Sequence, residues 1–161
     1  MPPESICLAC GLCCDGTLFA RTQLAGEEIV RLGRRHGTMA ASMPQPCACL
    51  KDGRCGIYDE RPQVCRSFRC TLLERHQDGQ VGREESLRVI AAAKAAHAAL
   101  LEVLPPGMSL PDLRRAAAAG DSESQPWRAA RHQVYLRLCT LEDHLQRHFR
   151  PPLTEEDAAG S

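Results

Sequence analysis

Ten cysteines in a chain of 161 residues are the feature of this sequence with the clearest chemical meaning. Nine of them lie in two segments near the start of the chain. The first segment, Cys7 to Cys14, holds four thiols within eight residues, and the second, Cys47 to Cys70, holds five. Cys139 stands alone. Thiols this close together in sequence are typical of disulfide frameworks or of metal sites.

Two observations favour metal over disulfides. The N-terminus, Met1 to Ile6, has no basic start and no apolar stretch of the signal-peptide type, so we expect a cytoplasmic chain. Thiols there stay reduced unless a metal holds them. The spacings from Cys7 to Cys10 and from Cys10 to Cys13 let a tight turn aim two sulfurs at one ion. Zinc sites and iron–sulfur sites both use such spacings, so the residues alone leave the two open.

The cysteines belong to a longer composite pattern. Its pieces are Cys7, Cys10, Gly11, Cys13 and Cys14, then Pro46-Cys47, Asp52-Gly53-Arg54-Cys55, Ile57-Tyr58, Arg61-Pro62, Cys65-Arg66 and Cys70. With these pieces, residues 5–72 resemble the YkgJ-type CxxCxxCC cysteine-cluster family of zinc- or iron-chelating domains. The resemblance implies eight metal-binding thiols, which are Cys7, Cys10, Cys13, Cys14, Cys47, Cys55, Cys65 and Cys70. Cys49 is an additional thiol that the family pattern does not call for.

The resemblance implies chelation of zinc or iron as the function. An iron–sulfur cluster with a redox or enzyme-accessory role is the alternative. The resemblance also implies that the domain can lie beside an enzymatic activity, because some family members carry the cysteine cluster inside a flagellin lysine N-methylase. The chain shows no glycine-rich phosphate loop, nucleophile elbow or spaced carboxylate pair. We therefore expect a protein that is not an enzyme on its own.

Composition bounds the fold and the partners. Hydrophobic residues make up 43% of the chain but aromatic ones only 4%, so we expect metal sites to supply much of the fold in the N-terminal half. We expect one soluble domain over residues 1–161, with a cysteine-cluster part at 5–72 and a helical part at 83–150. A formal charge of zero and the lack of a membrane-length apolar run predict neither nucleic acid nor membrane as a partner. The metal ion is the expected partner, and the sequence names no protein partner.

Arginines beside the cysteines suit a thiolate site, because nearby positive charge helps to keep thiolates ionised. Those next to candidate ligands are Arg54, Arg61, Arg66 and Arg69. The competing interpretation is that Arg61 pairs with Asp59 or Glu60 on the surface, since exposed ion pairs are common and weak.

The predicted fold class is mostly α with a small metal-stabilised loop and hairpin region. In the first half, alternating residues predict a strand over Thr17–Thr22 with Phe19 buried. Glutamates early and basic residues late predict a helix over Gly26–His36. Small residues and a proline indicate a connector over Thr38–Gln45.

Asp52-Gly53 is the strongest hairpin signal in the sequence. A two-residue loop pairs Leu50 with Cys55 and places Cys47 and Cys55 on opposite faces, because side chains alternate along a strand. If those two thiols share a metal, we expect a longer loop or a bulge.

Four helical segments are expected after the hairpin. A short one over Pro62–Phe68, with the proline first, would place Cys65 near a helix N-terminus, where a thiolate is favoured. The longer ones are Arg83–Leu104, Leu110–Ala119 and Trp127–Phe149. Their expected apolar rows are Val89, Ala93, Ala96, Leu100 and Val103, with Ile90, Leu101 and Leu104 beside them, and Trp127, Ala130, Val134, Leu138, Leu141, Leu145 and Phe149.

The remaining candidate ligands favour structural roles. His144 and His148 lie one turn apart, which suits metal binding, but basic residues in the last turn of a helix also suit its dipole. His97 is expected to be a core or edge histidine. Cys139 has no ligand partner at a useful spacing, so we expect a small buried apolar side chain.

Overall fold

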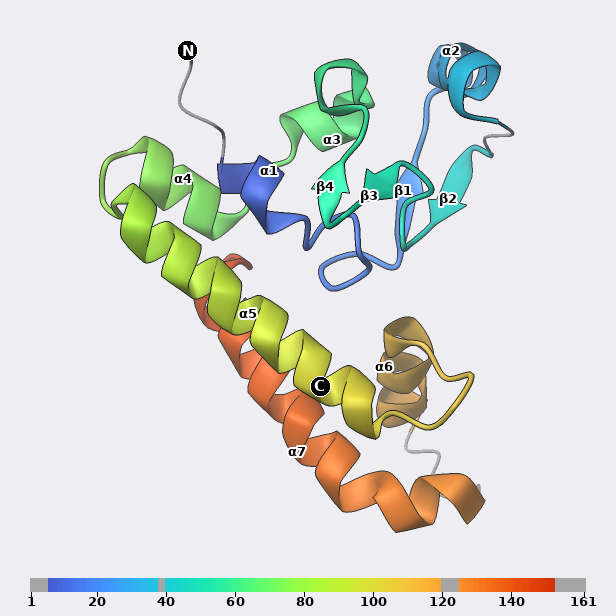
Figure 1. Cartoon of the computed structure of the whole chain (residues 1–161), viewed down its shortest axis with the longest axis vertical. Helices are drawn as coiled ribbons and strands as arrows, with labels where there is room; N and C mark the ends of the chain where they lie inside the picture. The colour runs from blue at the N-terminus through green and yellow to red at the C-terminus, as the bar shows by residue number, and fades with distance from the viewer. Residues whose placement is uncertain (1–5, 38–39, 120–124, 153–161) are drawn as a thin grey trace. The chain divides into compact units, whose positions relative to one another are not determined.

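The computed structural model of the chain describes residues 6–37, 40–119 and 125–152 (Figure 1). The fold is mostly helical with two small antiparallel sheets, which confirms the predicted fold class. The chain divides into two compact units, one from residues 1–68 and 105–127 and the other from 69–104 and 128–161. Among the described residues, no helix is both long and apolar enough to cross a membrane.

The first unit consists of short elements joined by turns. They are α1 (Ile6–Cys10), β1 (Arg21–Gln23), α2 (Gly26–His36), β2 (Ser42–Pro44), β3 (Leu50–Lys51), β4 (Arg54–Cys55), η1 (Tyr58–Glu60), α3 (Gln63–Ser67) and α6 (Leu110–Ala119). The second unit holds the short helix α4 (Thr71–Gln77) and the two longest helices, α5 (Arg83–Val103) and most of α7 (Gln125–His148).

The predicted strand at Thr17–Thr22 is displaced toward the C-terminus. Strand β1 begins at Arg21 and pairs antiparallel with β2, so part of the expected connector is a strand as well. The earlier residues are not extended, because the backbone N–H of Thr17 donates to Asp15 Oδ1 at 2.8 Å and turns the chain. Phe19 is exposed, so its predicted burial is wrong. Its ring instead meets Phe68 edge-on, with 4.8 Å between ring centroids.

The hairpin has the shorter of the two loops considered. Leu50 pairs with Cys55, and Asp52 and Gly53 take φ values of 48° and 72°. Positive φ at both loop residues matches the right-handed twist of the flanking strands. The hairpin therefore has neither the longer loop nor the bulge that was expected if Cys47 and Cys55 share a metal. A turn lies between Cys47 and β3, closed by a hydrogen bond from the backbone N–H of Leu50 to the Cys47 carbonyl. The direction of the Cys47 side chain therefore does not follow from the alternation of side chains along β3.

Helix α2 has the predicted bounds and supplies much of the core of the first unit. Glu28 lies in its first turn, and Gly37 follows its last residue with φ of 87°. The helix buries Leu32 against Leu24 and Cys49. The partly buried residues around this cluster are Ile29, Met43, Cys47 and Ile57. The apolar core therefore reaches directly into the second cysteine segment.

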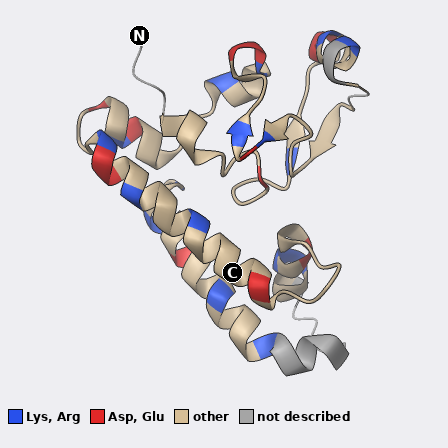
Figure 2. Ribbon diagram, in the orientation of Figure 1, with Lys and Arg blue, Asp and Glu red and all other residues tan. Residues whose placement is uncertain are grey.

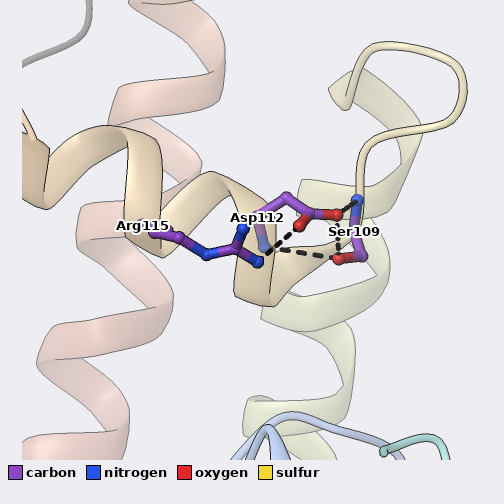
Figure 3. A network of polar contacts seen from close by, with 3 residues as sticks. All are labelled: Ser109, Asp112 and Arg115. Carbon is purple, nitrogen blue, oxygen red and sulfur yellow. Dashed lines mark hydrogen bonds and ion pairs between the residues drawn. The ribbon is translucent and has the colours of Figure 1, made fainter.

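Helix α6 has the predicted bounds and begins with a reciprocal cap (Figure 3). Ser109 Oγ accepts the backbone N–H of Asp112 at 3.3 Å, and the Asp112 carboxylate accepts the backbone N–H of Ser109 at 3.2 Å. Arg115 donates to the same carboxylate at 2.7 Å. Arg114 reaches the carbonyl of Thr17 at 2.8 Å, which fixes α6 within the first unit.

Removing this cap should weaken the first unit by a small amount. We expect Ser109→Ala to lower the free energy of unfolding by about 1 kcal/mol, as is typical of an N-cap serine, whereas Ser109→Thr keeps the hydroxyl and should lose less. Hydrogen bonds from Ser109 lower the pKa of Asp112. The stability that these hydrogen bonds add is present above the unfolded-state pKa of about 4, and it is lost as pH falls through the pKa of Asp112 in the folded protein. Urea unfolding should therefore show a smaller difference in free energy of unfolding between Ser109→Ala and wild type in acid.

The second unit is built on the contact between α5 and α7, which run alongside each other in Figure 1. The predicted apolar rows are confirmed for the residues that are buried: Val89, Ile90, Ala93, Leu100, Val134, Leu138, Leu141, Leu145 and Phe149. Leu101 is 50% exposed, so its predicted place beside the row is wrong. The side chains of Trp127 and Ala130 lie outside the described residues. Acidic and basic residues are interspersed along α5 (Figure 2).

Helix α4 had no counterpart among the predicted elements. The end of α7 holds its first residue, because Thr71 donates from its backbone N–H to the Phe149 carbonyl and from Oγ1 to the Arg150 carbonyl. Leu72 and Leu73 are buried. This short helix therefore packs as part of the helical core.

The histidines and Cys139 complete the description of the second unit. His144 Nε2 lies 3.0 Å from the Val89 carbonyl oxygen, a structural contact between α7 and α5. Burial, helped by His144 and two arginines, lowers the pKa of His148 and favours its neutral form. His97 is half-buried, as expected of an edge histidine. Cys139 is exposed, so its predicted burial is wrong: it lies on the solvent side of α7, one position past buried Leu138.

Candidate metal centre

The first cysteine run begins on α1. Cys7 and Cys10 lie three positions apart on this helix, a spacing that places two side chains on one face. Gly11 then turns the chain with φ of 73°. A Cβ at this glycine would lie 2.6 Å from the carbonyl oxygen of Gly53, so only glycine fits there. This close approach seats the first cysteine run against the loop of the hairpin.

Backbone and thiol contacts join the two cysteine segments. The backbone N–H of Cys47 donates to the carbonyl of Cys14 at 2.7 Å, across a sequence separation of 33 residues. The side chains of Cys14 and Cys55 are hydrogen-bonded to each other. Residues from the N-terminal run, the turn before β3 and strand β4 thus meet at one place.

Opposite pKa shifts mark the thiol pair. The hydrogen bond from Cys14 lowers the pKa of Cys55 to about 6, with further help from the backbone N–H of Ile57 and from the Arg61 guanidinium. The pKa of Cys14 is raised by the same hydrogen bond, by burial, and by the charges of Cys55 and other thiols. Because the two sulfurs share one proton, these opposite shifts belong to the Cys14–Cys55 pair and favour one thiolate within it.

Arg61 places a positive charge beside these thiols. Its guanidinium lies over the Tyr58 ring, 3.9 Å from the centroid, and donates to the Tyr58 carbonyl at 2.5 Å. From there its charge lowers the pKa of Cys55 and opposes the rise in the pKa of Cys65. An arginine that supports the thiolates stays a prediction.

Cys65 occupies the third position of the short helix α3. The predicted first residue, Pro62, lies one position before the helix, which begins at Gln63. The residue is exposed as a whole, but protein atoms around its sulfur desolvate the thiolate and raise its pKa to about 11. The charges of Cys47 and Cys55 add to this shift, and Arg61 opposes it. Cys65 lies near the start of a short helix as predicted, and its burial and the neighbouring thiols disfavour the thiolate there.

A family model described as "Putative zinc- or iron-chelating domain", with the name CxxCxxCC, matches residues 6–89. The chain belongs to the CxxCxxCC family. The match covers more than half of the 161 residues and extends beyond the predicted limit of residue 72 into α5. No curated protein and no solved structure matches the chain.

Cys49 is the thiol that the CxxCxxCC pattern does not call for, and its surroundings differ from those of the others. It is 5% exposed and belongs to the apolar cluster with Leu24 and Leu32. Burial raises its pKa to about 11. Its backbone N–H donates to Cys47 Sγ at 3.4 Å, so its main chain supports a neighbouring sulfur while its side chain packs in the core.

The eight predicted ligands divide into three groups. Cys13, Cys14, Cys47, Cys55 and Cys65 belong to one network of electrostatic interactions in the first unit. Cys7 and Cys10 lie on α1, which packs against β4. Cys70 directly precedes α4 and belongs to the second unit. All ten cysteines lie within the described residues, and none of them forms a disulfide.

Several cysteines of this CxxCxxCC chain lie near one another, but their sulfurs do not form a complete set of ligands around one point. Across the described ranges 6–37, 40–119 and 125–152, no three Cys, His, Asp or Glu side chains are arranged to hold one metal ion. The Cys14 and Cys55 side chains instead share a hydrogen bond. The fit to zinc or iron therefore rests on the donor chemistry, because soft thiolates with nearby N–H donors and a guanidinium suit both metals.

Sequence reasoning missed three contributors to this site. The backbone N–H groups of Cys49 and Ile57 point to sulfurs, and no side-chain pattern reveals a backbone donor. Glu28 lies near Cys65, although only its place in the first turn of a helix could be inferred from the sequence. Its burial distinguishes it from its exposed neighbour Glu27, but burial is a property of the fold that the sequence does not show.

Proposed function

We propose that this protein chelates zinc or iron through thiolates drawn from both cysteine segments, in a reducing compartment such as the cytoplasm. The observation that carries the proposal is the meeting of Cys14, Cys47 and Cys55 through a backbone hydrogen bond and a thiol pair. A connection of 32 residues separates Cys14 from Cys47, so the meeting is a product of folding. Family membership adds support, since the family description names the same two metals.

The proposed ligands are the eight thiols that the family pattern implies: Cys7, Cys10, Cys13, Cys14, Cys47, Cys55, Cys65 and Cys70. Neighbouring side chains such as Cys13 and Cys14 diverge, so we infer that they serve different metals or bridge two. Arg61 would offset negative charge, and the N–H groups of Cys49 and Ile57 would stabilise the sulfurs that they face. The bound metal would link distant segments and add its binding free energy to folding.

Metal analysis of protein purified without oxygen tests this function. We expect zinc or iron in a fixed ratio to protein, with Cys139→Ser keeping that ratio because Cys139 is exposed on α7. Cys14→Ser should lose metal. A colourless sample indicates zinc, and a brown one an iron–sulfur cluster, which is the alternative with a redox or accessory role. Protein that binds neither metal under reducing conditions contradicts the proposal.

A further inference from the structure

Glu28 is a buried carboxylate that no cysteine motif includes. It lies on α2, within the connection between Cys14 and Cys47, and is 7% exposed. Its sequence neighbour Glu27 is exposed. A buried carboxylate is costly unless hydrogen bonds satisfy it, so the contacts that Glu28 makes reveal what it does.

Both oxygens of Glu28 accept backbone N–H groups. Oε2 accepts the N–H of Ala25, the residue before α2, at 3.1 Å. Oε1 accepts the N–H of Gln63, the first residue of α3, at 2.6 Å. The carboxylate thus satisfies one unpaired donor at the start of each helix and joins segments that are 35 positions apart.

A second contact strengthens this junction. Arg31 lies three positions after Glu28 on α2, and its guanidinium donates to the carbonyl of Glu60 at 3.1 Å. Helix α2 therefore holds the chain at Glu60 and again at Gln63. Cys65 follows two residues after the second point, on a helix of only five residues.

We propose that Glu28 is a positioning residue for Cys65, setting where α3 carries this sulfur relative to Cys47 and Cys55. The inference rests on the proposed function, in which Cys65 is a metal ligand. Glu28 does not act as a ligand itself, because backbone donors occupy both of its oxygens. Its charge raises the pKa of Cys65, so a carboxylate at this place has no electrostatic advantage for the thiolate. Its contribution is to fix the position of α3.

The test compares two single variants that weaken the junction from opposite sides, one at the acceptor Glu28 and one at the donor Gln63. Glu28→Gln keeps the shape but leaves one of the two N–H groups without an acceptor. Gln63→Pro removes the donor itself, and proline suits the first position of a helix. Pro62, the residue before it, already has φ of −54° and ψ of 154°, which a following proline allows. Glu27→Gln is the matched control, since it removes an exposed carboxylate from the same helical turn.

Zinc affinity is measured by competition with a chromophoric chelator, and Co²⁺ spectra report the number of thiolates bound. We expect Glu28→Gln and Gln63→Pro each to weaken binding about 10- to 100-fold, the usual effect of losing an outer-shell partner, with Glu27→Gln unchanged. In a Cys65→Ser background the two variants should cause no further loss. Unchanged affinity in both variants, or an equal loss in the Cys65→Ser background, overturns the inference. If the Glu28→Gln protein does not fold, the zinc affinity of Gln63→Pro, alone and in the Cys65→Ser background, tests the inference. Wild type that binds no metal refutes the proposed function instead.

Discussion

Removal of the bound metal by an added chelator is expected to unfold the first unit, while the helices α4, α5 and α7 persist. The strands of the first unit are two or three residues long, and an isolated hairpin of that kind is marginal in water. Its core cluster consists of Leu24, Leu32 and Cys49 with partly buried neighbours. Structural zinc contributes on the order of 10–16 kcal/mol to folding in small metal domains, more than this core could replace. The long helices of the second unit have their own buried rows and do not share this dependence.

Hydrogen exchange read segment by segment is the measurement for this result. After a strong chelator is added under reducing conditions, the amides of Cys47 and Leu50 should exchange freely, whereas amides in the middle of α5 and α7 stay protected. Circular dichroism should show partial and not complete loss of helix signal. A chelated protein that keeps protection at Cys47 would show that metal is not needed for the fold of the first unit.

Single cysteine changes should reproduce part of the same effect. Cys14→Ser removes the partner of Cys55 and changes the residue whose carbonyl accepts from Cys47, so we expect loss of more than one metal equivalent. Cys13→Ser should behave similarly if the adjacent thiols serve different metals. Cys139→Ser is the matched control on α7. Full metal content in either Cys13→Ser or Cys14→Ser would exclude a shared cluster.

Periodic segments were predicted well from the sequence because their signals are local. Helices α2 and α6 have the predicted bounds, and the long helices differ by one or two residues. The hairpin was located by Asp52-Gly53, since a loop with positive φ at both positions depends on those two residues. These elements needed no knowledge of the rest of the fold.

Two of the misses have a different cause, which is contact between distant residues. Phe19 was expected inside a strand, but its ring partner is Phe68. The direction of Cys47 follows from a turn and from the Cys14 carbonyl, neither of which strand alternation contains. Cys139 was expected to be buried because a thiol without ligand partners behaves as a small apolar side chain, but it lies one position past the buried face of α7 and is exposed. The type of ligand could be predicted from the sequence, whereas the positions of the ligands depend on tertiary contacts.

The largest effect of a substitution in the second unit is expected for Leu141→Ala. Leu141 is fully buried in the middle of α7, within the row that packs on α5. Truncating a buried leucine removes apolar contact and leaves a cavity, which usually costs about 2–5 kcal/mol. Leu138→Ala, in the same row, should also destabilise the unit. Urea unfolding of the metal-loaded protein, followed by hydrogen exchange in α5 and α7, measures the change.

Leu136→Ala is the matched control for this prediction. It makes the same chemical change on the same helix, but Leu136 is 51% exposed and its truncation opens no cavity. We therefore expect its effect to stay within about 0.5 kcal/mol, as for most surface substitutions. Metal content should be unchanged in both variants, because neither residue is one of the proposed ligands. Equal stability of the Leu141→Ala and Leu136→Ala proteins would mean that the buried face of α7 has been assigned wrongly.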